Sequence, residues 1–308
     1  MVKLQQLKDQ LNTIYLGKSN VIDLCLTALI AEGHILLEDV PGTGKTMLAK
    51  ALANSFDSAF SRIQFTADLL PSDVIGSDFF NMKTQEFENK RGPLFANVVL
   101  IDEINRAVPR TQSALLEAME ERQVSIGGTT YQMPAPFFVI ATQNPIESSG
   151  TFPLPDAQLD RFMVAIEVGY PNLEHERQLL NEVLANVRKQ AIGIATGGDL
   201  ITWQEEARRV HASQDVLDYL LAIVQATRHH ALVEVGVSPR GAIALLRASQ
   251  SFAFLSGRDF IIPEDVKYLA KHVLSHRLTL TLEGGIKTTK ADVLLHLLDD
   301  IPVPVEME

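Results

Sequence analysis

The chain has few of the features that mark secreted and membrane proteins. Its 308 residues include a single cysteine, Cys25, so no disulfide can form within the chain, which is typical of a reducing compartment. The first six residues, Met-Val-Lys-Leu-Gln-Gln, include polar and charged residues where a secretory signal needs an apolar core. No stretch approaches the ~20 apolar residues of a membrane-spanning helix. The sequence therefore predicts a cytoplasmic protein that does not insert into a membrane.

Positive charge is also scarce. The chain has 27 Lys and Arg residues against 38 Asp and Glu residues, a net charge of −11. This balance argues against a broad, nonspecific affinity for nucleic acid or anionic membranes. The composition, 46% hydrophobic and 21% charged, is ordinary for a globular protein, and the length predicts about two domains.

A glycine-rich segment lies between a short apolar run, residues 34–37, and a run of helix-forming residues, 47–56. Strand, glycine loop and helix are the context that a phosphate-binding loop requires. The pattern G-x-x-x-x-G-K-[ST] is met except at its first position, where Asp39 replaces a glycine at the point farthest from the phosphates. The sequence predicts that a nucleotide is bound by Pro41, Gly42, Thr43, Gly44, Lys45, Thr46 and Met47.

Each part of this loop has a physical role. Gly42 and Gly44 allow a tight turn and a close approach of backbone N–H groups to an anion. Lys45 supplies a positive charge for the β- and γ-phosphates, and the hydroxyl of Thr46 can bind Mg²⁺. The positive end of the following helix dipole favours the same anion. An ordinary Pro-Gly turn would leave Gly-Lys-Thr at the helix start unexplained.

A second motif follows four apolar residues, Val98 to Ile101, which predict a buried parallel strand. Asp102 and Glu103 come at the carboxyl end of this strand, where ligands bind in open α/β sheets. We expect Asp102 to hold Mg²⁺ through its water shell and Glu103 to act as the general base of ATP hydrolysis. A solvated acidic pair is the alternative, and the phosphate-binding loop upstream favours the catalytic interpretation.

Two further residues are candidates for contacts with the γ-phosphate. Asn144 follows an apolar strand and could orient the attacking water, although an Asn-Pro turn explains it as well. Arg161 precedes another apolar strand and could be an arginine finger. Taken alone, Arg161 fits a surface ion pair better, because arginine is common on surfaces.

Arg240 stands out because of its place in a predicted helix. Ser238 is a suitable N-cap and Pro239 suits the first helical position, so Arg240 falls in the first turn. A cation there opposes the helix dipole, which indicates a nearby anion. The anion could be a nucleotide phosphate or a neighbouring carboxylate.

The pattern along the chain changes near Val168. Before it, apolar strands alternate with helices, and beyond it the signals are helical. We expect a nucleotide-binding core over 1–168 and a linker with an all-helical lid over 169–308. Within the core, residues 77–96 are irregular and look inserted. Gly127-Gly128 predicts a β-hairpin that contains no Lys or Arg from Gln123 through Pro136.

Together these motifs resemble those of the MoxR family of AAA+ ATPases, in the order in which that family carries them. They are Val40-Pro-Gly-Thr-Gly-Lys-Thr46, Val98-Val-Leu-Ile-Asp-Glu-Ile-Asn-Arg-Ala107, Gln112-Ser-Ala-Leu-Leu-Glu-Ala-Met119, Ala141-Thr-Gln-Asn-Pro145, Leu159-Asp-Arg-Phe162 and Ser238-Pro-Arg-Gly-Ala242. The resemblance implies an α/β fold, with a P-loop αβα core whose parallel sheet has the order 5-1-4-3-2, and a helical lid. It also implies ATP and Mg²⁺ as cofactors, with ATP bound between the subunits of a ring that is usually a hexamer.

The resemblance assigns roles by position. Asn144 corresponds to sensor 1, Arg161 to the arginine finger and Arg240 to sensor 2. Residues 77–96 correspond to an insert within the second helix of the core, and residues 123–136 to a hairpin before sensor 1. The family's members act as chaperone-like remodellers, often with partners that contain a von Willebrand A domain.

The leading prediction is an ATP-hydrolysing ring that remodels or matures protein partners. A nucleic-acid motor is the first alternative, because related AAA+ helicases share the inserts. The acidic net charge and the uncharged hairpin count against it, since a loop that tracks a strand needs Lys or Arg. The motor subunit of a metal chelatase is the second alternative.

Overall fold

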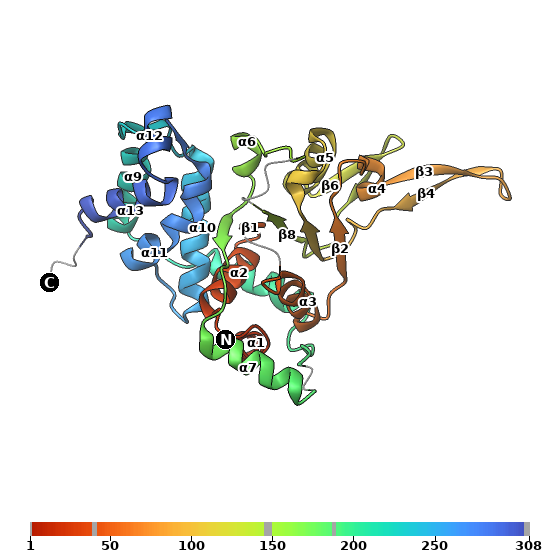
Figure 1. Ribbon diagram of the computed structural model, residues 1–308, viewed down its shortest axis with the longest axis horizontal. Coiled ribbons are helices and arrows are strands. Elements are labelled where there is room, and N and C mark those ends of the chain that lie inside the picture. The colour runs from red at the N-terminus through yellow and green to blue at the C-terminus, as the bar shows by residue number, and fades with distance from the viewer. Residues whose placement is uncertain (1, 39–41, 145–149, 187–188, 305–308) are drawn as a thin grey trace. The chain divides into compact units, whose positions relative to one another are not determined.

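The computed structural model describes residues 2–38, 42–144, 150–186 and 189–304 (Figure 1). These residues form two compact units. The first unit comprises Met1–Ile22, His34–Leu154 and Glu167–Ile201, and the second comprises Asp23–Gly33, Pro155–Ile166 and Thr202–Glu308. In the part of the chain that the structure describes, no helix has both the length and the apolar character needed to cross a bilayer.

A five-stranded sheet with the order β2-β5-β8-β1-β9 organises the α/β part of the chain. The neighbouring pairs β2–β5, β5–β8 and β1–β8 are parallel. The strands are β1 (Ile35–Glu38), β2 (Phe60–Gln64), β5 (Val98–Asp102), β8 (Phe138–Gln143) and β9 (Val164–Glu167). Numbered along the chain, the core strands run 5-1-4-3-2, which confirms the predicted order. The three central strands β1, β5 and β8 are almost wholly buried, which explains their continuous apolar runs.

Helix α1 of the first unit buries one apolar stripe. Leu4, Leu7 and Leu11 lie three and four residues apart, so they share one buried face of α1. Helix α3 packs on β2 and β5 and also contacts α1. The helices are α1 (Val2–Ile14), α3 (Lys45–Ser55), α4 (Pro71–Ile75), α5 (Pro109–Glu121), α7 (Leu173–Leu184) and a 3₁₀ turn, η1 (Ile104–Arg106).

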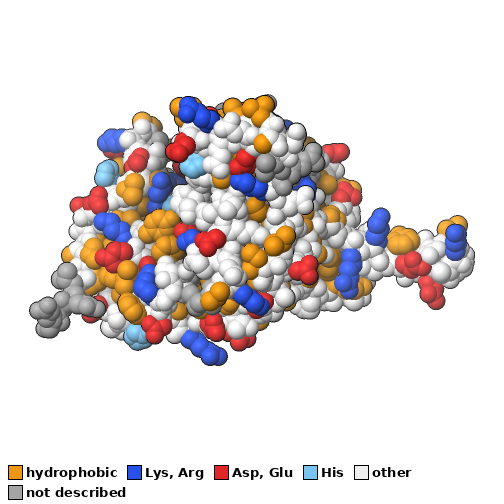
Figure 2. Space-filling view, turned by 90° about the horizontal axis from the view of Figure 1, so that it is seen from below, with side chains coloured by type: hydrophobic (Ala, Val, Ile, Leu, Met, Phe, Trp, Pro, Cys, Tyr) orange, Lys and Arg blue, Asp and Glu red, His pale blue; other side chains and the backbone are white. Residues whose placement is uncertain are grey.

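Two hairpins extend the first unit. Strands β6 (Gln123–Ile126) and β7 (Thr129–Gln132) form the hairpin that the sequence predicts, with Gly127 and Gly128 both at positive φ. Strands β3 (Gly76–Asn81) and β4 (Glu86–Arg91) form a second, antiparallel hairpin, so this segment is more regular than the sequence predicts. Figure 1 shows this hairpin projecting beyond α4, and Figure 2 shows side chains of both charges along it. Both faces of a projecting hairpin meet solvent. Its sequence therefore lacks the alternation of apolar and polar residues that would predict its strands.

The second unit is built mainly of helices that share a core around Leu245, Leu269 and Leu294. Helix α11 contacts α9, α10 and α13. The elements are α2 (Ser19–Ile30), α6 (Asp156–Leu159), α9 (Gln214–His229), α10 (Pro239–Leu255), α11 (Pro263–Leu274), a 3₁₀ turn η2 (Ser275–Arg277), α12 (Leu282–Lys287) and α13 (Lys290–Asp300). Helix α8 (Gly197–Ala207) begins in the first unit and ends in the second, as does α2, whose residues from Asp23 onward lie in the second.

The helical lid also contains a small sheet. Strands β10 (Val233–Val235) and β11 (Thr279–Leu280) pair in antiparallel fashion. Strands of two or three residues are too short to show a period of two in the sequence. Their pairing joins segments on either side of α10 and α11.

Candidate functional site

The glycine loop leads directly into α3, whose first residue is Lys45. Gly44 is the N-cap at φ 86° and Gly42 lies at φ 89°, a region that favours glycine. The first N–H groups of a helix have no partner within the helix, so they can bind an anion. The hydroxyl of Tyr15 donates to the carbonyl of Thr43 at 2.8 Å, which ties the loop to the end of α1. Pro41 lies outside the described residues.

The two predicted acids lie at the end of β5. Asp102 is its last residue, and Glu103 follows with φ 57° and ψ 53°, a left-handed conformation that is uncommon outside glycine. The backbone N–H of Glu103 donates to the hydroxyl of Thr142 at 3.0 Å, which fixes this turn. Strained backbone of this kind tends to occur at functional sites.

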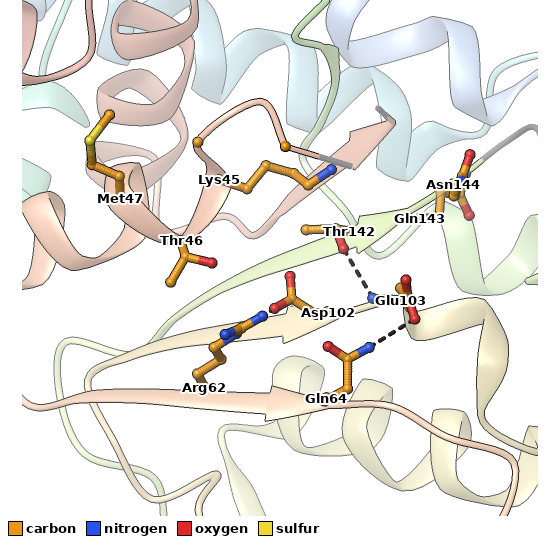
Figure 3. Close-up of a pocket in the computed structure, with 12 residues that line it drawn as sticks. Lys45, Thr46, Met47, Arg62, Gln64, Asp102, Glu103, Thr142, Gln143 and Asn144 are labelled. Carbon is orange, nitrogen blue, oxygen red and sulfur yellow. Dashed lines mark hydrogen bonds and ion pairs between the residues drawn. The ribbon is translucent and has the colours of Figure 1, made fainter. Parts of the chain in front are cut away.

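The loop and the strand ends enclose a cavity of about 470 Å³ (Figure 3). This volume lies within the usual range for small-molecule sites. Figure 3 shows the amine of Lys45 directed into the space between the glycine loop and the ends of β5 and β8. The lining residues are Gly42, Gly44, Lys45, Thr46, Met47, Arg62, Gln64, Asp102, Glu103, Thr142, Gln143 and Asn144. The structure therefore brings together most of the residues that the sequence predicts for binding and hydrolysis.

Strand β2 contributes two residues that the sequence interpretation missed. The Nε of Arg62 lies 2.6 Å from Oδ2 of Asp102, and Gln64 donates from Nε2 to Oε2 of Glu103 at 2.8 Å. Arg62 and Gln64 are two residues apart, so they share one side of the strand. The β2–β5 register sets Gln64 beside Asp102, and this register is what brings both side chains to the acids. The sequence does hold one sign of these two site residues. Arg62 and Gln64 are polar and two positions apart in a run, residues 60–64, that otherwise looks like a strand.

Glu103 has a second partner beyond β2. The Nε of Arg106 in η1 lies 2.8 Å from the same Oε2 oxygen. At the end of β8, Gln143 donates from Nε2 to Oε1 of Glu38 at 2.5 Å, and this bond links the ends of β8 and β1. Asn144 is the residue after Gln143, so it directly follows a strand end that this bond holds in place.

The donor set of the cavity suits a hard divalent cation. The Thr46 hydroxyl and the Asp102 carboxylate both line it, and oxygen ligands are those that Mg²⁺ prefers. The Asp102 side chain is 10% exposed and already attracts one cationic group, the guanidinium of Arg62. Within the described ranges there is no cluster of three His, Cys, Asp or Glu residues that could hold a metal. Mg²⁺ is usually held by one or two protein groups together with phosphates and water, and Thr46 and Asp102 supply two such groups.

Arg161 and Arg240 belong to the second unit, whereas every residue that lines the cavity belongs to the first. The predicted helix start is confirmed: Ser238 caps α10 by accepting from the N–H of Gly241 at 3.1 Å, and Pro239 is the first helical residue. Ser238 also donates to Oδ2 of Asp160 at 3.1 Å. The segments that carry Arg161 and Arg240 are therefore joined through Asp160.

A buried arginine anchors this junction. Arg277 places its Nε 2.6 Å from Oδ1 of Asp160 and donates to the carbonyls of Phe162 and Met163. Burial lowers the pKa of Arg277 to about 10, and the Asp160 carboxylate acts in the opposite direction. Arg277 consequently remains charged at neutral pH. No local pattern singles out Asp160 or Arg277, because their contact spans 117 residues of chain.

Comparison with known proteins agrees with this architecture. Residues 34–164 match the ATPase family associated with various cellular activities (AAA), and residues 225–294 match the AAA lid domain. The chain is 47% identical over 300 residues to the uncharacterized protein YeaC of Bacillus subtilis, covering 97% of this chain and 94% of that protein. It is 41% identical over 305 residues to Chaperone MoxR1 of Mycobacterium tuberculosis, covering 96% of this chain and 81% of that protein.

A solved structure shows the same fold. The crystal structure of a protein from Cytophaga hutchinsonii, described on a provisional basis as an ATPase, matches with a TM-score of 0.91 and 38% identity, covering 98% of this chain and 95% of that chain. The sheet order, the lid and the family matches define the class of AAA+ ATPases. Within that class, the chain belongs to the MoxR family. ATP binding and hydrolysis are the activity that this membership supports.

Proposed function

We propose that this protein is a Mg²⁺-dependent ATPase that assembles into a hexameric ring and that remodels or matures protein partners. The observation that carries the proposal is the shared cavity, in which Lys45 and Thr46 at the start of α3 line the same space as Asp102 and Glu103 at the end of β5. A chaperone-named relative supports protein partners as the clients. A partner with a von Willebrand A domain stays a prediction of the family resemblance, and a cytoplasmic location stays a prediction of the sequence.

The residues of the cavity divide the chemistry among them. Lys45 and the N–H groups at the start of α3 would bind the phosphates, and Thr46 and, through water, Asp102 would hold Mg²⁺. When bound, Mg²⁺ neutralises charge that develops on the phosphate oxygens. Glu103 accepts a proton from the attacking water, and Asn144 orients that water. Gln64 and Arg106 both contact Oε2 of Glu103, so the other carboxylate oxygen, Oε1, is the atom that accepts the proton in our proposal.

The two arginines of the second unit complete the site in our proposal. Arg161 reaches the γ-phosphate held by a neighbouring subunit, and Arg240 contacts a nucleotide phosphate. The junction through Asp160 supports a shared role, because it fixes the two segments that carry these arginines. Residues 1–168 would then act as the nucleotide-binding core, and residues 169–308 as the linker and lid.

A nucleic-acid motor is less well supported by the charges of the hairpins. The β3–β4 hairpin, residues 76–91, carries three acidic and three basic residues, so it has no net positive charge. Residues 123–136, which contain the β6–β7 hairpin, have no Lys or Arg. Hairpins that follow a nucleic-acid strand need positive charge to bind the phosphate backbone.

Phosphate release from ATP tests the proposal. We expect turnover with Mg²⁺, none in excess EDTA, and no stimulation by single- or double-stranded DNA at physiological salt. Light scattering should show assembly that ATP promotes, because the nucleotide would bridge subunits. DNA-stimulated turnover would favour the motor, and absence of turnover from every assembled form would contradict the proposed ATPase.

A further inference from the structure

Asp102 has one cationic partner that the proposed mechanism does not use. The Nε of Arg62 lies 2.6 Å from Oδ2 of Asp102 and both residues line the cavity. Figure 3 shows the guanidinium of Arg62 directed at this carboxylate from β2. Among the described residues, Arg62 provides the side chain that is bonded to the Asp102 carboxylate. The neighbouring Gln64 and Arg106 both bond Glu103 instead.

The environments of the two side chains differ. Asp102 is 10% exposed, whereas Arg62 is 51% exposed on β2, a strand at the edge of the sheet. A carboxylate that is largely removed from water is costly unless a positive charge compensates it. Arg62 supplies that charge, and its exposure leaves it free to change partners at a small cost in burial.

A metal ion at Asp102 would be attracted by the negative charge of its carboxylate, and Arg62 now neutralises that charge. Two cations that share one carboxylate repel each other strongly at short range. A site that holds Arg62 on Asp102 therefore binds a divalent cation less well than an uncompensated carboxylate would. The same contact keeps the negative charge of Asp102 from repelling the phosphates of a metal-free nucleotide.

We propose that Arg62 and Mg²⁺ compete for the carboxylate of Asp102, so that Arg62 neutralises Asp102 until the metal arrives with the nucleotide. Arg62 is then a positioning residue that sets how strongly nucleotide binding depends on Mg²⁺. This inference rests on the proposed function of the same cavity. It predicts that loss of the guanidinium weakens nucleotide binding without metal and strengthens metal binding.

The measured quantity is the ratio of nucleotide affinity with Mg²⁺ to nucleotide affinity in EDTA. Calorimetry with an ATP analogue whose β–γ bridge is an imido group gives both affinities without hydrolysis. In Arg62→Gln we expect this ratio to rise about tenfold, the effect of one charge-assisted hydrogen bond. Arg62→Lys keeps a positive charge and should stay within about threefold of the wild type. A purely structural role would change both affinities alike and leave the ratio unaltered.

Arg177→Gln is the matched control, because it removes the same charge from an exposed position on α7, outside the cavity. Its ratio should equal that of the wild type. Electron paramagnetic resonance with Mn²⁺ and no nucleotide gives a second readout, in which Arg62→Gln should bind Mn²⁺ more tightly than the wild type. If circular dichroism shows that Arg62→Gln does not fold, Arg62→Met, which keeps most of the aliphatic stem, replaces it.

The outcomes separate this inference from the proposed function. A wild-type protein that does not bind the analogue contradicts the proposed function itself. A wild-type protein that binds the analogue in a Mg²⁺-dependent way, together with a folded Arg62→Gln whose ratio and Mn²⁺ affinity are unchanged, overturns only the competition between Arg62 and the metal.

Discussion

Gln64 and Glu103 are joined across the adjacent strands β2 and β5 by a hydrogen bond of 2.8 Å from Nε2 to Oε2. The proposed general base is therefore held by a neutral side chain, with Arg106 as its second partner. A base must lie within hydrogen-bond reach of the water that it deprotonates, so the side chains that orient Glu103 affect the rate. The same bond ties the catalytic turn to an edge strand of the sheet.

Replacing Gln64 tests this orienting role. In Gln64→Ala we expect kcat to fall about tenfold while the affinity for nucleotide stays within about twofold, because Gln64 contacts the base and the lost bond involves a charged group. Gln64→Asn keeps the amide on a shorter side chain, so its kcat should lie between the kcat of Gln64→Ala and that of the wild type. Steady-state kinetics and calorimetry measure the two quantities. A raised KM with an unchanged kcat would show that Gln64 acts on binding instead.

Lys45 gives a test of the binding half of the site. Lys45→Ala removes a cation that lines the cavity beside the glycine loop, so nucleotide affinity should drop by about two orders of magnitude, the upper range for a charged hydrogen bond. Lys50→Ala is the control on the same helix, because Lys50 is exposed and lies near the ring of Phe60 rather than in the cavity. Wild-type affinity in Lys45→Ala, measured by calorimetry, would count against the assignment of the loop.

Contiguous motifs were the part of the site that the sequence predicted best. Lys45, Asp102 and Glu103 each lie at or after the end of a strand that the sequence shows as an apolar run, so both the residues and their place at the carboxyl ends of the strands could be inferred. Arg62 and Gln64 depend on the register between β2 and β5, which no local pattern reveals.

The parts of the fold that the sequence missed have a common cause. In β3, Phe79 and Phe80 are consecutive and each is 44% exposed, so the strand shows no buried face. Its pairing is visible only in space, where the rings of Phe80 and Phe87 lie 5.3 Å apart across the hairpin. The contact of Asp160 with Arg277 likewise joins distant segments, and only the folded chain reveals it.

The stability of the core should depend on pH through His34. This buried side chain places Nε2 3.1 Å from the carbonyl of Met119, and its Nδ1 accepts from the N–H of Val139 at 3.1 Å. Burial lowers the pKa of His34 to about 4 from its usual 6.5. Since the folded pKa lies below the unfolded pKa, the unfolded chain binds the proton first, and stability falls as pH drops from about 6.5 to about 4.

Urea unfolding of the wild type and His34→Gln over this pH range measures the effect. The difference in free energy of unfolding between pH 7 and pH 4 should be smaller in His34→Gln by up to about 3 kcal/mol, the value of a pKa shift of this size. Parallel curves for the two proteins would show that His34 does not titrate differently in the folded and unfolded states.

Arg161 tests whether the site is completed by a neighbouring subunit. Arg161→Ala should fold and bind ATP but hydrolyse it poorly, because an arginine finger can contribute about 10³–10⁵ in rate. Mixing Arg161→Ala with Glu103→Gln should restore part of the activity, since some interfaces would join an intact Glu103 to an intact Arg161. The gain should depend on the mixing ratio and vanish when assembly is prevented.

Two results would go against action between subunits. Mixed rings that form but stay inactive at every ratio would leave it unsupported. Turnover of Arg161→Ala alone at the wild-type rate would show that Arg161 is an ordinary surface arginine.

The central claim is that the cavity hydrolyses ATP with Glu103 as the base, and Glu103→Gln tests it most directly. The substitution keeps the size and shape of the side chain and removes its ability to accept the proton. Calorimetry and phosphate release on one preparation give the affinity and the rate. We predict ATP affinity within about threefold of the wild type and turnover lower by about 10²–10⁴-fold, the usual contribution of a general base. Wild-type turnover in Glu103→Gln would contradict the account.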